Sequence, residues 1–293
     1  MKDALATLAV VLVSTLVSAQ MPAPGSNPIA RHYRDGETLT YHMTASNEEW
    51  HYTADATCTA KKAANGSYVE EFVWTGMTSN GQPNPLEPAM AQFRQPLSLD
   101  PNWAPSMPDL SKVDSKMIGP ITDLMTFYVD LWLMNKIGFL QHAGDHFHVP
   151  NPQPSSWADG TQVILGKDHI DFDLNLQSID KANQTAVVVV HHVPPTHPNL
   201  QLPAEWMQAP ISGTANNWVE VKKTKDGKYE AGIGKETFDV TIKVSTVDGK
   251  ILSASMENPV VTSVRVCDDA ELTKCGTAQP HTILRHVEIA LVH

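Results

Sequence analysis

Several motifs of well-known enzyme classes are missing from this 293-residue chain. It contains no G-x-S-x-G, which carries the serine nucleophile of α/β-hydrolases, and no H-E-x-x-H, which binds zinc in metalloproteases. It also lacks G-x-x-x-x-G-K and G-x-G-x-x-G, the glycine-rich loops that hold nucleotide phosphates. The sequence therefore does not decide whether the protein is an enzyme.

Cysteine and positive charge are also scarce. The three cysteines form no C-x-x-C motif, which argues against a thiol redox enzyme. The chain has 21 lysines and arginines against 32 aspartates and glutamates, and its formal net charge is −11. This balance argues against nucleic acid and against anionic membrane surfaces as partners.

No apolar run near the start is long enough for a membrane-spanning helix, which needs about 20 residues. Lys2 gives the chain a positive start, residues 4–16 form a short apolar run, and Val17-Ser18-Ala19 offers the small residues that a signal peptidase reads. We therefore expect a signal peptide at 1–19 and a periplasmic or secreted protein with no transmembrane segment after cleavage.

Beyond the signal peptide, residues 20–35 are expected to form a flexible leader, followed by a single β-rich domain at 36–293. In "GETLTYHMT", Leu39, Tyr41 and Met43 face one way and the polar residues between them face the other. Such alternation is typical of half-buried antiparallel strands.

The same alternation continues to the end of the chain. Two Asp-Gly pairs, at 226–227 and 248–249, lie between alternating segments and predict tight hairpins. The proline-rich residues 80–119 predict a long loop. Together these patterns predict a strongly curved antiparallel sheet, which can be a half-barrel, a barrel or a two-sheet sandwich.

Residues 120–137 predict one helix that is apolar on nearly every side. Pro120 suits its first position, and Gly138 is a natural stop. A helix of this kind is either buried or spans a membrane, and charged residues such as Asp123 and Asp130 argue against spanning. We expect the helix to be buried and to pack against the curved sheet or to plug it.

The opening "GETLTY", the long hairpins and the apolar helix together resemble periplasmic lipoprotein-carrier-like half-barrels and other envelope proteins built the same way. The resemblance covers the architecture of most of the chain after the signal peptide. It involves no diagnostic motif and transfers no functional residue. It implies a concave apolar surface that accepts an acyl chain or another apolar ligand. The candidate ligand-binding residues lie on the helix and are Met125, Phe127, Asp130, Trp132 and Met134.

Asp130 lies in the middle of the apolar helix, where a buried carboxylate needs a partner or a raised pKa. In one interpretation it lines a pocket together with Asp123, which is seven residues away on the same helix face. In the interpretation that we favour, Asp130 faces a polar rim or pairs with a strand residue such as Arg285.

Two segments, "LQHAGDHFHVP" at 140–150 and "HHVPPTHP" at 191–198, concentrate the histidines. Imidazole nitrogens are good ligands for zinc and copper, the candidate metals here. The candidate ligands are His142, His146, His148, His191, His192 and His197. Alternatively, Phe147 and Val149 point inward, which leaves His146 and His148 in water. A metal site therefore requires the two segments to meet.

Cys267 and Cys275 flank an acidic loop between two strand-like segments, so we expect a disulfide that clamps the loop. Cys58 alternates in phase with Tyr52 and Ala56, which predicts a buried free thiol.

Three functions remain open. The first is a non-enzymatic exported protein that binds an apolar small molecule, a lipid or an envelope partner. The second is a metal carrier or metal-dependent enzyme built on the histidine segments, and no other cofactor is expected. The third is a structural or adhesive surface domain. The sequence determines neither the ligand nor the oligomeric state.

Overall fold

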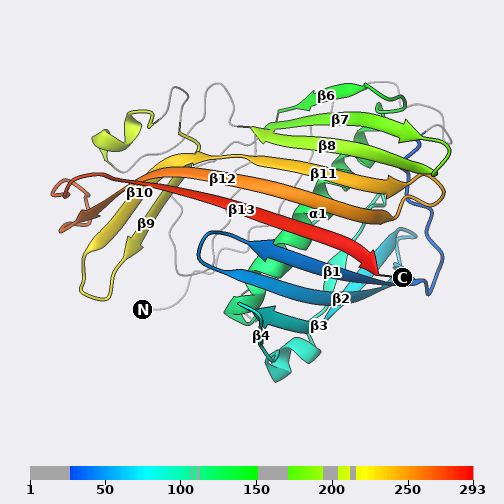
Figure 1. The fold of residues 1–293 in the computed structure, drawn as a ribbon, viewed down its shortest axis with the longest axis horizontal. Coiled ribbons are helices and arrows are strands. Elements are labelled where there is room, and N and C mark those ends of the chain that lie inside the picture. The colour runs from blue at the N-terminus through cyan, green and yellow to red at the C-terminus, as the bar shows by residue number, and fades with distance from the viewer. Residues whose placement is uncertain are drawn as a thin grey trace.

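The computed structural model describes residues 27–106, 108–110, 113–150, 171–193, 204–211 and 216–292, without the side chain of Trp218. Within these residues the fold is mainly β, and thirteen strands form one antiparallel sheet (Figure 1). The strands are β1 (Thr38–Ser46), β2 (His51–Lys62), β3 (Tyr68–Ser79), β4 (Gln82–Pro83), β5 (Gln95–Leu97), β6 (His146–Val149), β7 (Asp171–Asp180), β8 (Thr185–Val193), β9 (Trp218–Lys223), β10 (Tyr229–Glu236), β11 (Phe238–Ser245), β12 (Ile251–Cys267) and β13 (Gln279–Val292).

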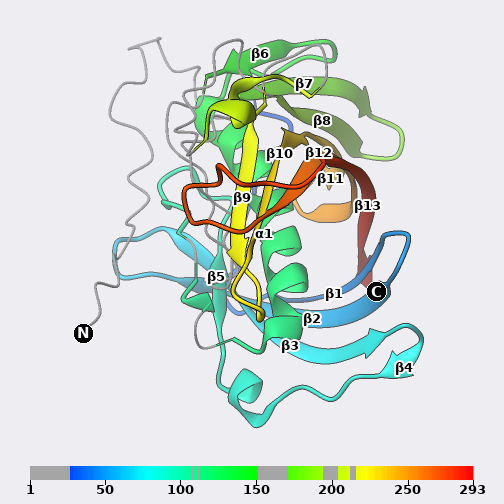
Figure 2. The same cartoon turned by 90° about the vertical axis from the view of Figure 1, so that its left-hand side faces the viewer.

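The sheet is curved and open. Its main path runs β4-β3-β2-β1-β13-β12-β11-β8-β7-β6, and its two end strands do not pair with each other in the described residues. Figure 2 shows the strands wrapping around helix α1 (Ile118–Ile137), which lies on the concave side. The prediction of a strongly curved antiparallel sheet is confirmed, and of the forms left open the closed barrel does not occur among these strands.

Alternation along each strand assigns one face to the core and the other to the outer surface. On β1, Leu39, Tyr41 and Met43 are buried, whereas His42 and Thr44 lie on the outer face and are half-buried. The same pattern recurs on β2, β8 and β11, so the concave face is apolar and the convex face is polar.

Helix α1 begins after a 3-10 turn at Ser115–Met117 and ends at Gly138, whose left-handed conformation (φ 68°) closes the last turn. The predicted helix at 120–137 is confirmed, although Pro120 is its third residue rather than its first. Three quarters of its side chains are buried, because the helix meets the sheet on one side and loop segments on the other. The helix thus completes the main core.

A second, smaller core lies where β12 and β13 extend beyond the main sheet with β9 and β10 (Figure 1). Met207, Ile233 and Leu272 are buried there. The Cys267–Cys275 disulfide closes the adjoining loop, which confirms the predicted pair. Cys58 is buried in the main core and unpaired, also as predicted.

Residues 27–35, which the sequence predicted to belong to a flexible leader, run along the end of the sheet and make specific contacts. Ile29 is fully buried in the main core, and the backbone N–H of His32 donates to the carbonyl of Asp248 at 2.9 Å. The proline-rich loop at 80–119 contains short elements in its described part, including β4, β5 and a 3-10 turn at Pro88–Ala91.

Candidate functional site

Among the described residues, several polar clusters and a ligand-sized hollow are candidates for a functional site. The first cluster lies at the middle of helix α1. Nε2 of His192 lies 2.8 and 2.9 Å from the two carboxylate oxygens of Asp130, and both side chains are buried. The His192 ring packs between those of Phe172 and Phe238. Burial raises the pKa of Asp130, while the neighbouring His192 opposes the rise.

The second carboxylate of helix α1, Asp123, also reaches the sheet. It accepts a hydrogen bond from the Tyr52 hydroxyl at 2.6 Å and an ion-paired hydrogen bond from Arg285. Asp130 pairs with a strand residue, as the favoured interpretation predicted, but this residue is His192. The named example, Arg285, was wrong, because Arg285 binds Asp123. Asp123 therefore fixes the helix to β13, and Asp130 fixes it to β8.

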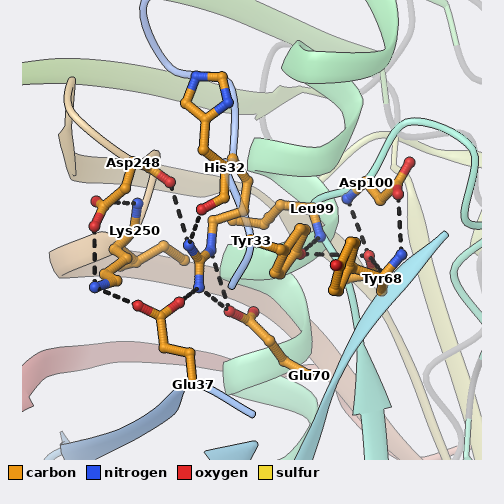
Figure 3. A network of polar contacts seen from close by, with 12 residues as sticks. His32, Tyr33, Glu37, Tyr68, Glu70, Leu99, Asp100, Asp248 and Lys250 are labelled. Atoms are coloured by element: carbon orange, nitrogen blue, oxygen red, sulfur yellow. Dashed lines mark hydrogen bonds and ion pairs between the residues drawn. The ribbon is translucent and has the colours of Figure 1, made fainter. Parts of the chain in front are cut away.

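The third cluster fastens the N-terminal segment (Figure 3). Nη2 of Arg31 lies 2.6 Å from Glu37 and 2.9 Å from Glu70, and the Arg31 and Glu70 side chains are buried. Lys250 bridges Glu37 and Asp248 at 2.7 and 3.0 Å. Burial raises the pKa of Glu70, although the Arg31 charge opposes this. The geometry of this cluster, with ion pairs among four side chains, is that of a structural clamp.

Next to the clamp, Tyr33 also attaches the N-terminal segment to the rest of the fold (Figure 3). Its ring stacks on Tyr68 with a centroid separation of 5.2 Å, and its hydroxyl accepts a hydrogen bond from the Leu99 backbone N–H at 2.8 Å. Burial raises the pKa of Tyr33 above its ordinary value. The tyrosine is therefore a neutral packing residue, and not a candidate acid or base.

The other predicted ligand-binding residues of the helix, Met125, Phe127, Trp132 and Met134, are buried in the main core. The indole N–H of Trp132 donates to the Asp100 carbonyl at 3.1 Å. The gap recorded beside the helix, against residues 96–106, measures about 10 Å³. Such a gap holds at most one water molecule. Helix α1 thus packs into the concave face of the sheet, and binding of an apolar ligand by these helix residues stays a prediction.

Among the described residues, the predicted metal ligands do not form a metal site, although the sheet places His148 and His191 on the same face two strands apart. Successive residues of β8 point to opposite faces, so His191 is exposed while His192 is buried. His142, in the turn before β6, is exposed and lies 3.6 Å from Asp145. His197 lies outside the described residues. In the part of the chain that is described, no group of three or more His, Cys, Asp or Glu side chains is arranged to hold a metal ion.

The outer face instead carries histidines and carboxylates in a row across neighbouring strands. His148 on β6 lies opposite Asp173 on β7, which in turn lies opposite His191 on β8. His191 lies opposite Asp239 on β11. Nδ1 of His148 is 2.6 Å from Asp173, and Nδ1 of His191 is 2.6 Å from Asp239. The orientation with Phe147 inward is therefore the one adopted, and His146 and His148 are exposed.

A groove of about 480 Å³ lies on the same outer face, over the central strands β1, β13, β12 and β11. We call the short side chains Ser253, Ser255 and Ala290 the floor of the groove, and the longer ionisable side chains His42, Lys243 and Glu288 its margin. The other lining residues are Thr44, Val187, Thr241, Ala254 and Ile289. Small-molecule sites in proteins commonly measure about 300–1,000 Å³.

The groove exists because short residues fall into register. Ser253 on β12 lies opposite Ala290 on β13 and opposite Lys243 on β11. Two residues along, Ser255 lies opposite Glu288. At one corner, Nδ1 of His42 is held 2.7 Å from Asp55. Sequence reasoning missed this site, because its only local signal is the Ser-x-Ser of β12 and the strand pairing cannot be read from one strand.

No protein-family model matches the chain, and a search of curated proteins gives no match. None of the helices in the described segments combines the length and the apolar character that crossing a membrane requires. Evidence for the function therefore comes from the sequence and the geometry of this chain.

Proposed function

We propose that the protein is an exported binding protein that holds a small ligand in the outer-face groove. The observation that carries the proposal is the groove itself, a hollow of about 480 Å³ with short residues at its floor and Lys243, Glu288 and His42 at its margin. A hollow lined by short side chains and a few charged ones can bind a ligand through its shape and through charges at fixed positions. A flat, uniformly polar sheet surface would offer neither.

A binding role fits the chemistry of the margin. The His42 imidazole is hydrogen-bonded to Asp55, and the Glu288 carboxylate lies 3.1 Å from His286. A nucleophile activated by a base would require a close hydroxyl or thiol partner for one of these groups. Among the described residues, no such partner of His42 or Glu288 is recorded, so the margin is suited to holding charged ends of a ligand.

Export is the second part of the proposal. It is supported by the signal-peptide pattern at 1–19, which lies outside the described residues, and by the Cys267–Cys275 disulfide. Disulfides persist in oxidising compartments such as the periplasm and the extracellular space.

The proposal places the ligand on the convex face and not on the concave one. An apolar ligand on the concave face would have to displace helix α1, which is held by Asp123 and Asp130 and by its apolar contacts. Displacing a helix from a packed core exposes a large apolar area to water. The outer groove requires no such rearrangement.

The test is native mass spectrometry of the protein purified from the exported fraction of the cells that express it. We expect a bound small molecule that survives gentle desalting. Ala290→Trp fills the floor of the groove and is expected to abolish this adduct. The matched control is Ala64→Trp, at an exposed position in the turn before β3. An adduct that persists in Ala290→Trp overturns the groove as the site.

A further inference from the structure

We infer that the groove takes a linear zwitterion about three amino-acid residues long, with its anionic end at Lys243 and its cationic end at Glu288. This inference rests on the proposed binding function of the groove and specifies its ligand class. It follows from the charges of these two residues, from the strand register that separates them, and from the hydroxyl groups between them.

Lys243 supplies the cationic end of the groove. It is exposed on β11, and within the described residues no hydrogen bond or ion pair of its ammonium group is recorded. Its charge acts at a distance on Asp180, whose pKa is lowered first by its own hydrogen bonds with Asn183 and also by Lys243. The ammonium group is therefore available to a ligand carboxylate.

Glu288 supplies the anionic end. It is exposed on β13, and its Oε1 lies 3.1 Å from Nε2 of His286. A carboxylate offers about four acceptor positions on its two oxygens, so one contact with an imidazole leaves room for a ligand ammonium group. The two charged residues flank the groove on different strands and do not pair with each other in the described structure.

The register gives the distance between the two ends. Lys243 lies opposite Ser253, and Ser253 lies opposite Ala290, which is two residues beyond Glu288 on β13. Two strand spacings of about 4.8 Å and two residues of about 3.4 Å give a Cα separation of about 12 Å across the diagonal. An extended tripeptide spans about 10 Å, so its two charged ends reach both side chains.

Between the charges, the floor suits a polar chain with small substituents. Ser253 and Ser255 both lie on the outer face of β12, and their hydroxyls can donate to or accept from amide groups of the ligand. Ala290 leaves space without adding polarity. We expect the ligand to carry small side chains such as those of alanine, which match the short residues of the floor.

The test uses four forms of one peptide. Trialanine carries both charges, N-acetyl-trialanine keeps only the carboxylate, trialanine amide keeps only the amine, and N-acetyl-trialanine amide carries neither. Binding is followed by ¹H–¹⁵N NMR titration of the full chain at low salt. We expect trialanine to shift the amide signals of Ser253, Ser255 and Ala290. Loss of either charge should weaken binding about fivefold, as for a solvent-exposed ion pair.

Two variants assign the ends. Lys243→Gln is expected to weaken the binding of trialanine about fivefold. It should leave the binding of trialanine amide unchanged, because that form has no carboxylate. Glu288→Gln is expected to weaken the binding of trialanine and to leave the binding of N-acetyl-trialanine unchanged, because that form has no charged amine. Both residues are exposed, so the variants should fold, and unchanged NMR signals far from the groove check this.

The outcomes separate the ligand class from the function. If the form without charges binds as tightly as trialanine, or if only one end matters, the zwitterion is refuted while the groove remains a binding site. If none of the four forms shifts the groove signals but Ala290→Trp abolishes a native adduct, the ligand class is again refuted alone. If no form binds and no adduct depends on Ala290, both proposals fail.

Discussion

His192 and Asp130 form a buried pair at the centre of the molecule, with Nε2 of the imidazole 2.8 Å from one carboxylate oxygen and 2.9 Å from the other. The preceding residue, His191, forms the same kind of pair with Asp239 at 2.6 Å, but on the exposed face. One dipeptide thus places two chemically similar pairs in opposite environments, which allows a direct comparison of their contributions to stability.

We expect Asp130→Ala to lower the free energy of unfolding by about 1–3 kcal/mol, because it leaves a buried nitrogen of His192 without its hydrogen-bond partner. Asp239→Ala removes the equivalent exposed contact and is expected to cost less than about 1 kcal/mol. Urea denaturation of both variants measures the difference. Equal effects of the two substitutions would mean that the buried pair does not hold the helix to the sheet.

The cysteines give a second prediction. Burial raises the pKa of Cys58, and the other two cysteines are joined, so the folded protein should not react with iodoacetamide. Unfolding without reductant should expose one reactive thiol, and unfolding with reductant should expose three. Mass spectrometry counts the adducts. Rapid labelling of the folded chain would contradict the packing of β2 against the core.

Loss of the disulfide has its own expected magnitude. Chain-entropy estimates give about 2.5 kcal/mol for a loop of about nine residues. Cys267→Ser combined with Cys275→Ser should therefore lower the free energy of unfolding by about this amount. Because the loop adjoins the smaller core, we expect the loss to be visible first in Trp206, which packs there and donates to the Leu272 carbonyl. The NMR signal of the Trp206 indole N–H during urea unfolding follows this region.

Those parts of the fold that depend on local pattern could be predicted from the sequence. The burial of Tyr41 and Met43, the helix stop at Gly138 and the Cys267–Cys275 pair each follow from neighbours in the chain. The alternation on β6 allowed two orientations, and only its pairing with β7 decided that Phe147 faces the core.

The candidate site could not be predicted, because it is a property of several strands together. Ser253, Ser255 and Ala290 are unremarkable on their own strands, and the hollow forms only when β12 and β13 align. The suggestion that Asp130 pairs with Arg285 was wrong for a similar reason. His192 and Arg285 are both strand residues that can reach a helix carboxylate, and only the order of β8 and β13 in the sheet assigns each to its partner.

Gly249 and Gly227 provide a matched test of the N-terminal segment. Both follow an aspartate in a hairpin turn and adopt positive φ, 70° and 85°. A Cβ at Gly249 would lie 2.3 Å from the Ala30 carbonyl oxygen, whereas a Cβ at Gly227 would meet no atom within 4 Å. Gly227→Ala should lower the free energy of unfolding by about 1 kcal/mol, because alanine is strained in the left-handed conformation.

Gly249→Ala should lower the free energy of unfolding by more, about 2–4 kcal/mol, because its Cβ also overlaps the backbone of the N-terminal segment. Thermal and urea unfolding of the two variants give the comparison. The same cost for both would show that residues 27–35 do not rest on the turn between β11 and β12 in solution.

The clamp around Glu37 predicts a pH dependence. Burial alone would raise the pKa of Glu37, but hydrogen bonds from Lys250 and Arg31 outweigh this and hold the pKa below its ordinary value. The folded state therefore binds the proton less tightly than the unfolded state. The stabilisation is fully present above pH 4.5 and is lost as the pH falls through the lowered pKa.

Glu37→Gln should accordingly lower the free energy of unfolding by about 1.5–3 kcal/mol at pH 7, since two charge-assisted hydrogen bonds are weakened. The difference from the unmodified protein should shrink as the pH falls from 4.5 toward 3, because the carboxyl of the unmodified protein then becomes neutral as well. Urea unfolding between pH 3 and pH 7 measures it, with Glu49→Gln, at an exposed position before β2, as the control. A difference that stays constant over this range would show that ionised Glu37 contributes nothing to the clamp beyond its shape.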